Sequence, residues 1–291
     1  MSEVNINKKG WKYQWSEYED NILREYYPKG GYEEVLKFLP NRNKGGIQGR
    51  ASKIGIKYLH YNYDYFEKIN TPEKAYWLGF IYTDGYITTK NRFGMELSIS
   101  DINHMQKFLD AIEYNGKIRT RKRKIGESKN TTTSCQFQIK NSKLYNDLLN
   151  CGLTRTKTND MTFPDEDILP LDLRPHFIRG VFDGDGSFVF YNYKRLRKDR
   201  NNKIYTCTYK EINFVCKSDI FINEIKKIIK DESNADFNLT CSSRDNLPTL
   251  RTSKADNLIK FINYIYPNKD SDVFLERKYK ISQDILKYCL I

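Results

Sequence analysis

Two short stretches of this sequence combine an apolar run with an aspartate near its end, and paired aspartates can bind a metal ion. The first stretch covers residues 75–86 and contains Asp84 followed by glycine. The second covers residues 176–187 and contains Asp185 followed by glycine, 101 positions later. Carboxylate oxygens are ligands that hard divalent cations prefer. The repeated aspartate therefore predicts a cation-binding site.

A glycine lies in the middle of each stretch, again 101 positions apart, at Gly79 and Gly180. A glycine inside a helix costs about 1 kcal/mol relative to alanine, and close approach of a second backbone would offset that cost. Thr71, followed by proline and glutamate, is a typical helix start, and the run after it is apolar on nearly every side, which indicates a core helix. We expect two helices packed through these glycines, with Asp84 and Asp185 together at one end.

Each aspartate falls at the expected C-terminal end of its helix, where the helix dipole disfavours negative charge. Two carboxylates brought close together would also raise one pKa, unless metal ions lie between them. The simpler interpretation of either stretch is a buried helix that ends in a common Asp-Gly turn. That interpretation suits a single copy, but two copies at corresponding places of an internal repeat favour a shared chemical role for Asp84 and Asp185.

The two stretches resemble the paired motifs of single-chain LAGLIDADG homing endonucleases. The segment 178–186 (IRGVFDGDG) is close to the family pattern. The segment 77–85 (WLGFIYTDG) keeps the glycine and the final Asp-Gly of that pattern. It departs from the pattern at three positions, which are Trp77, Leu78 and Tyr82.

The resemblance implies an α+β fold in which an α-β-β-α-β-β-α unit is duplicated and two antiparallel sheets form a saddle over DNA. The sequence itself shows the order helix, two strands, helix, two strands, helix in each repeat, with about ten extra residues expected in a hairpin at 192–203 of the second. The expected domains are a three-helix module at 1–60, a linker at 61–70, a first repeat at 71–170, and a second repeat with a final helix at 171–291.

The resemblance also implies double-strand cleavage of DNA by metal-activated water, with Mg²⁺ as the metal and Mn²⁺ able to substitute. Asp84 and Asp185 match the metal-binding acids of the family, whereas Asp183 matches a variable motif position. Family members often use a basic residue near the site. Alignment of the two repeats makes Lys140 the candidate and Arg251 its counterpart, and plain phosphate contact is the alternative role for both.

The composition favours a nucleic-acid partner. The 291 residues carry a formal net charge of +12, with 22 Tyr and 16 Phe. A basic chain rich in aromatic side chains suits nucleic acid better than lipid. No apolar run reaches the roughly 18 residues of a membrane span, and the first residues do not resemble a secretory signal. The six cysteines and three histidines lack zinc-site spacing, so we expect a cytoplasmic protein without a small-molecule cofactor.

Residues 1–60 predict three short helices. Ser16 and Glu19 form a capping-box pattern at the first, a second ends at Pro40, and the third spans 45–54 with a basic outward face. This is the format of helix-turn-helix readers, whose last helix enters the major groove, and the segment is similar to Myb/SANT-like modules. A small protein-interaction domain is the alternative. The candidate DNA contacts here are Gln48, Arg50 and Lys53.

Basic residues also cluster in the two repeats. Residues 117–124 contain six basic residues, residues 132–140 alternate as a strand should, and a second basic excursion lies at 193–200. A solvated hairpin is one interpretation of the first cluster, and a sheet facing the major groove is the other. The candidate DNA contacts of the repeats are Lys117, Arg119, Arg121, Arg123, Gln136, Gln138, Lys194, Arg195, Arg197 and Lys198.

The sequence therefore predicts a site-specific DNA endonuclease that acts on double-stranded DNA. Because two repeats in one chain already make a pseudo-dimer, we expect a monomer. A non-cleaving DNA-binding regulator and an RNA intron maturase are the alternatives on the same scaffold. The acid in both motifs favours the enzyme, since a pure DNA binder has no need to aim two carboxylates at phosphate.

Overall fold

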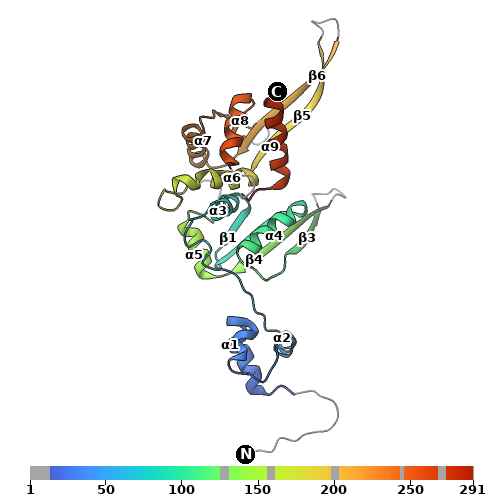
Figure 1. Cartoon of the computed structure of the whole chain (residues 1–291), viewed down its shortest axis with the longest axis vertical. Coiled ribbons are helices and arrows are strands. Elements are labelled where there is room, and N and C mark those ends of the chain that lie inside the picture. The colour runs from blue at the N-terminus through green and yellow to red at the C-terminus, as the bar shows by residue number, and fades with distance from the viewer. Residues whose placement is uncertain are drawn as a thin grey trace, which may run out of the picture. The chain divides into compact units, whose positions relative to one another are not determined.

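The computed structural model of the chain describes residues 14–124, 131–155, 161–197, 203–242, 246–267 and 273–290. The chain forms two compact units. The N-terminal unit extends to Tyr61 and includes the short segment Glu113–Gly116, and the second unit comprises Asn62–Ile112 and the chain from Lys117 onward. Figure 1 shows the helices of the N-terminal unit in blue.

The N-terminal unit contains α1 (Glu17–Leu36) and α2 (Lys44–Lys53). A capping box starts α1: the Ser16 hydroxyl accepts from the Glu19 N–H, and the Glu19 carboxylate accepts from the Ser16 N–H. The helical backbone of α1 is interrupted at Gly31, whose φ of 65° lies in the left-handed region that favours glycine. The described part of this unit therefore has three successive helical segments.

A small apolar core holds these segments together. Its buried side chains come from both helices and from the segment that joins them, and partly buried aromatic rings surround them. The buried members are Leu23, Tyr27, Val35, Leu39, Ile47 and Ala51.

The second unit contains two halves with the same order of elements. The first half consists of α3 (Pro72–Asp84), β1 (Gly85–Thr88), β2 (Arg92–Ser98), α4 (Ile102–Ala111), β3 (Arg119–Lys124), β4 (Thr131–Lys140) and α5 (Ser142–Asn150). The second half consists of α6 (Arg174–Gly184), β5 (Gly186–Arg197), β6 (Lys203–Val215), α7 (Asp219–Ser233), β7 (Asn238–Cys241), β8 (Pro248–Thr252) and α8 (Ala255–Ile265), and α9 (Glu276–Cys289) follows it. Short 3₁₀-helical turns precede α4 and α6, at Ile99–Asp101 and Leu171–Leu173.

Each half builds one four-stranded antiparallel sheet. The strand orders are β1-β2-β4-β3 and β5-β6-β8-β7, so the two sheets have the same topology. The predicted α+β fold with a duplicated α-β-β-α-β-β-α unit is confirmed. The alternation of Met95, Leu97 and Ile99 would extend β2 to Ser100, but β2 stops at Ser98 and Ile99 is exposed in a 3₁₀ turn.

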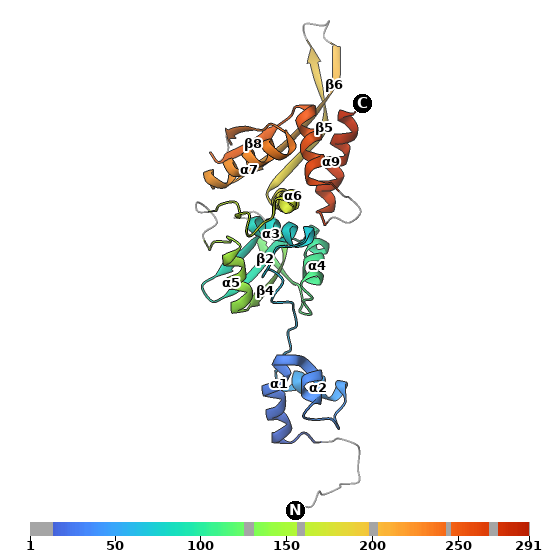
Figure 2. The same ribbon diagram turned by 60° about the vertical axis from the view of Figure 1, so that its left-hand side comes forward.

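The hairpin of β5 and β6 differs most between the halves. β1 pairs with β2 over four residues, whereas β5 pairs with β6 over twelve. Figures 1 and 2 show this hairpin continuing past helices α7–α9 as a long arm. The extra length lies in the hairpin where the sequence predicts it. β6 is one continuous strand, because its pairing with β5 has no break.

Apolar alternation fixes which face of each sheet is covered. In the first sheet Phe93, Phe137 and Ile139 are buried, and the ring of Phe108 on α4 packs against both phenylalanines. The opposite face of that sheet carries polar and basic side chains. Helices α3 and α6 cross at the centre of the unit (Figure 1). Among the described helices, none combines the length and the apolar composition that crossing a membrane requires.

Candidate active site at the paired helices α3 and α6

Helices α3 and α6 touch through their backbones at the two motif glycines. A Cβ atom added at Gly79 would lie 2.0 Å from the carbonyl oxygen of Phe177, and one added at Gly180 would lie 2.0 Å from the carbonyl oxygen of Tyr76. No real side chain tolerates such distances to backbone. The two glycines are therefore what lets the helices come this close, which is the packing role expected for them.

This close crossing brings the two motif aspartates to one place. Asp84 is the last residue of α3, and Asp185 follows the last residue of α6. A Cβ at Gly184 would lie 2.8 Å from Oδ2 of Asp84 and 1.8 Å from Oγ1 of Thr83. The carboxylate of the first motif thus lies directly against the turn that carries Asp185. Asp84 is half-buried and Asp185 is exposed.

The donors present suit a divalent cation that also takes ligands from its substrate. Both groups are carboxylates, and both lie at helix C-terminal ends, where the dipole makes the local potential negative. In the described part of the chain, no group of three or more His, Cys, Asp or Glu residues could hold a metal on its own. Two carboxylates leave coordination positions for phosphate and water oxygens, which is how Mg²⁺ usually binds beside a phosphate substrate.

Asp183, the third acid of the second motif, turns into the protein instead. Its carboxylate accepts hydrogen bonds from the Tyr76 hydroxyl (2.9 Å), the Leu275 N–H (2.7 Å) and the Tyr266 hydroxyl (3.3 Å). Burial raises the pKa of Asp183 to about 6. This side chain ties α6 to α3 and to the segment before α9, so its role is structural.

His104 extends the same buried network. Its Nε2 lies 2.8 Å from the Tyr76 hydroxyl, and its Nδ1 has no hydrogen-bond partner among the described residues. A protonated ring would leave a buried N–H without an acceptor, and burial accordingly lowers the pKa of His104 to about 3. The ring is therefore neutral, and the sequence offered no sign of this contact because His104 and Tyr76 lie on different elements.

Lys278 on α9 is a residue of the site region that sequence reasoning missed. Its Nζ donates to the carbonyl oxygens of Phe182 (3.0 Å), Gly184 (2.8 Å) and Gly186 (2.6 Å). Burial lowers the pKa of Lys278 to about 8. A signal was present in the sequence, since Lys278 falls on the buried stripe of α9 at helical spacing from Leu275.

The strand register corrects the alignment of the two basic candidates. Tyr86 on β1 pairs with Gly94 on β2, which pairs with Gln138 on β4. In the second sheet Ser187 on β5 pairs with Asn213 on β6, which pairs with Arg251 on β8. Tyr86 and Ser187 each lie two residues after a motif aspartate, so Arg251 corresponds to Gln138. The expected correspondence between Lys140 and Arg251 is therefore wrong by two residues.

A two-residue slip leaves the face pattern of a strand unchanged, because side chains alternate with a period of two. Phe137 and Ile139 are both buried and apolar, so either can be matched to the buried Leu250. The helices that follow agree with the register, because α5 begins at Ser142 and α8 at Ala255, the same spacing as from Gln138 to Arg251. The row nearest the motif turn thus holds a neutral amide in one half and a guanidinium in the other.

The predicted DNA contacts of the first sheet share one exposed face. Register places Arg119 opposite Gln136 and Arg121 opposite Ser134, on the side away from buried Phe137. Gln138 lies on the same face, and Lys117 is exposed just before β3. The set brought together is Arg119, Arg121, Arg123, Gln136 and Gln138, with Arg123 also bonded to Glu96 at 2.9 Å.

The second sheet divides its basic residues between two faces. Arg195 shares a face with Tyr191 and Tyr193, whereas Lys194 lies on the opposite face, which carries Phe190. The two tyrosines are exposed, and Tyr191 packs on Tyr209 of β6 at a ring distance of 5.2 Å. The backbone of Arg197 pairs with Lys203, and Lys198 lies outside the described residues.

In the N-terminal unit, Gln48 and Lys53 are exposed on α2. Arg50 is not presented in the same way, because its guanidinium donates twice to the Asp20 carboxylate on α1. This ion pair holds the pKa of Asp20 below its usual value. Arg50 therefore links the two helices, and it does not share the exposed position that the sequence predicts.

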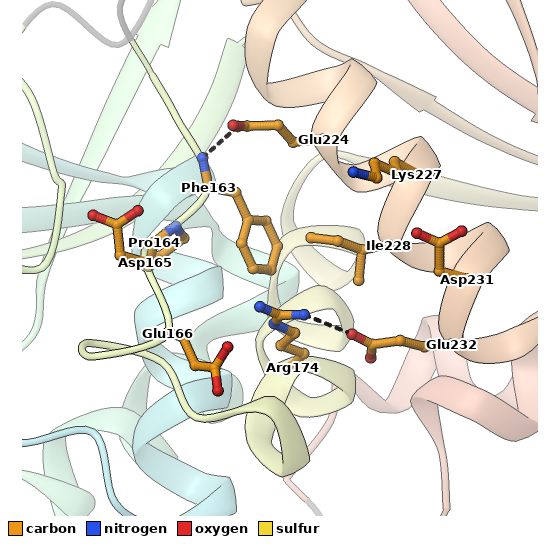
Figure 3. A pocket seen from close by; sticks show the side chains of 10 residues that line it. All are labelled: Phe163, Pro164, Asp165, Glu166, Arg174, Glu224, Lys227, Ile228, Asp231 and Glu232. Carbon is orange, nitrogen blue, oxygen red and sulfur yellow. Dashed lines mark hydrogen bonds and ion pairs between the residues drawn. The ribbon is translucent and has the colours of Figure 1, made fainter.

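A hollow between α6, α7 and the segment joining the halves is a poor match for DNA. Phe163 at its centre is held by a bond from its N–H to Glu224, and Arg174 pairs with Glu232 (Figure 3). Five carboxylates and two cations line it, which disfavours phosphate. The charged residues of this lining are Asp165, Glu166, Arg174, Glu224, Lys227, Asp231 and Glu232.

Comparison with known proteins identifies the fold. No protein-family profile matches the sequence, and no curated protein matches it. The homing endonuclease I-WcaI bound to its DNA recognition sequence matches with a TM-score of 0.51 at 16% identity, over 75% of this chain and 90% of that one. The meganuclease I-SmaMI bound to uncleaveable DNA (TM-score 0.48, 14% identity, 77% of this chain and 89% of that one) and the LAGLIDADG meganuclease I-AabMI bound to uncleaved DNA (0.48, 16%, 76% and 90%) are similar too. The duplicated α+β unit with its two four-stranded antiparallel sheets thus has the LAGLIDADG saddle fold.

Proposed function

We propose that this protein is a site-specific DNA endonuclease that makes a metal-dependent double-strand break at a long target site. The observation that carries the proposal is the convergence of Asp84 and Asp185 at the ends of two helices in backbone contact. The fold, shared with a homing endonuclease bound to its recognition sequence, supports the same activity.

In this proposal Asp84 and Asp185 hold Mg²⁺, or Mn²⁺ in its place, through their carboxylate oxygens. The bound metal would lower the pKa of a water molecule and offset charge on the leaving oxygen. Arg251 in one half and Lys140 in the other lie on the sheet faces that are not covered by helices. Their charges would hold the DNA backbone and offset the extra negative charge of the transition state.

The exposed cations of both sheets would supply sequence-independent grip, and the amides and guanidiniums among them would read bases. The N-terminal unit, as a Myb/SANT-like module, would add affinity by tethering a second contact through Gln48 and Lys53. Because the two halves already form a pseudo-dimer, the active species would be a monomer on double-stranded DNA.

The test is cleavage of a randomised duplex library with Mg²⁺ by the wild type, Asp84→Asn and Asp185→Asn. We expect discrete double-strand cuts from the wild type, and loss of these cuts by at least 100-fold in each variant with DNA binding retained, because a neutral amide is a weak ligand for a hard cation. Asp110→Asn on α4, an exposed acid outside the site, is the matched control and should cut normally.

Binding of a specific sequence without any cut, with either Mg²⁺ or Mn²⁺, would assign the scaffold to regulation and overturn the proposal. Preferential binding of structured RNA over duplex DNA would point to a maturase. Either result would direct attention to the exposed sheet faces, because the acids would then have no chemical role.

A further inference from the structure

Helix α9 follows the second half and has no counterpart after α5 among the described elements. One side of α9 is buried, and its buried residues recur at helical spacing. Four residues lie on this buried side, and one of them is a lysine only 6% exposed. The four residues are Leu275, Lys278, Ser282 and Ile285.

A buried ammonium group is costly unless its hydrogens are satisfied. All three donors of Lys278 have a carbonyl acceptor, at Phe182, Gly184 and Gly186. The carbonyls of Phe182 and Gly184 belong to the last turn of α6, where intrahelical donors run out, and the Phe182 carbonyl also accepts from the Asp185 N–H. Gly186 begins β5, so Lys278 contacts the backbone on both sides of Asp185.

Hydrogen bonds from Leu275 and Arg277 hold the start of α9, and Lys278 is the next residue of this helix. The N–H of Leu275 donates to the buried carboxylate of Asp183 at 2.7 Å. The guanidinium of Arg277 donates two hydrogen bonds of 2.9 Å to the carboxylate of Asp101, which belongs to the first half. The start of α9 is thus tied to both halves, while Lys278 donates to the motif turn of the second half.

We infer that Lys278 is a positioning residue: all three of its donors fix the turn carrying Asp185, whereas Asp84 is held only indirectly, through the contact of its carboxylate with that turn. The inference rests on the proposed function and deepens it. All three carbonyls bound by Lys278 belong to α6 and β5, whereas Asp84 ends α3 and leads into β1. Loss of the ammonium group therefore loosens the second half of the site more than the first, and the two DNA strands are then cut at unequal rates.

The experiment uses a supercoiled plasmid with one target site taken from the library, and full-length Lys278→Met, which is unbranched, shorter by one heavy atom and uncharged. We expect linear product to form at least tenfold more slowly than with the wild type, nicked circles to accumulate, and the Kd for DNA to change less than threefold. Strand-specific labels should place the nicks on one strand. Lys280→Met, two residues along the same helix and exposed, should behave as the wild type.

Equal slowing of both strands, nicks spread over both strands, or unchanged linearisation would each overturn the inference while leaving the endonuclease in place. A wild type that cuts neither strand overturns the proposed function and the inference with it. If thermal unfolding shows that Lys278→Met does not fold, the same ratio of nicked to linear product is measured for Lys278→Gln, which retains two N–H donors.

Discussion

Single atoms decide the geometry at the paired helices. The positions of Gly79 and Gly180 allow no Cβ atom, because a backbone carbonyl already lies 2.0 Å from where it would be. A Cβ at Gly184 would meet side chains, those of Thr83 and Asp84, so these would have to shift. The glycines of the motif are therefore required by space, and the aspartates are placed by that same close approach.

Gly180→Ala should lower the free energy of unfolding of the second unit by about 3 kcal/mol, since the new methyl group must push α3 away from α6. Denaturant unfolding followed by circular dichroism measures this. Gly49→Ala on α2 is the control, because no atom lies within 4 Å of its added Cβ. An equal, small effect of both substitutions would show that the helices adjust without cost.

Protonation of His104 should destabilise the protein in mild acid. The pKa of the folded form, about 3, is below the value of about 6.5 expected for an unfolded chain. The unfolded state then binds the extra proton, so stability is complete above pH 6.5 and falls as the pH drops toward 3, by up to ~1.4 kcal/mol per pH unit. The charged and titratable groups around His104 are Tyr76, Asp101, Lys107, Asp183, Arg277 and Lys278.

Comparison of the wild type with His104→Asn isolates this effect from the other groups, including Asp183, whose raised pKa acts in the opposite direction. Urea unfolding at pH 7, 6 and 5 should show about 2 kcal/mol less stability at pH 5 than at pH 7 from His104 alone. The variant should lack that part of the slope. Parallel pH profiles of the two proteins would rule out the neutral buried ring.

Within one helix or strand, neighbouring basic side chains can have different roles. On α2, Lys53 is exposed, while Arg50 makes its bonds to Asp20 on α1. Strands β3 and β5 show the same principle, since alternation sends successive basic residues to opposite faces. A charge run can therefore contain both residues bound within the fold and residues exposed to solvent.

Arg50→Gln should lower the melting temperature of the N-terminal unit, because Asp20 loses its partner. Lys53→Gln should leave that temperature unchanged and weaken DNA binding, with a salt slope shallower by about 0.9. Thermal unfolding by circular dichroism and filter binding at several salt concentrations separate the two effects. If Arg50→Gln alters only DNA binding, its bond to Asp20 is not what holds α1 and α2 together.

Across the whole molecule, charge is unevenly arranged. The chain has a net charge of +12, yet one hollow beside α7 is lined mainly by acids, while the uncovered face of the first sheet carries the exposed arginines of β3. DNA affinity should therefore depend on the sheet face far more than on total charge.

The double variant Arg119→Gln/Arg121→Gln should reduce the slope of log K against log salt by about 1.8, which is 0.9 for each lost phosphate contact. The matched control Lys227→Gln/Lys230→Gln removes the same charge from α7 and should change the slope little. Fluorescence anisotropy on one duplex from 50 to 300 mM salt measures both. Equal changes in the two double variants would mean that net charge, and no particular face, governs binding.

The sequence by itself determined the paired motifs, the order of elements in both halves and the long hairpin of the second. These follow from local rules: apolar period, helix starts, and glycines repeated at one offset. It also indicated the covered and uncovered faces of β4, because Phe137 and Ile139 alternate with polar residues.

Only the tertiary structure decided the contacts made between distant segments. A strand pattern of period two cannot separate Lys140 from Gln138 as the counterpart of Arg251, so the register had to come from the sheet. Asp183 and Asp185 are alike in sequence, and the helix rotation turns one inward and the other out. Lys278 reaches the motif turn from more than 90 residues away, since what satisfies a helix end is set by which element packs there.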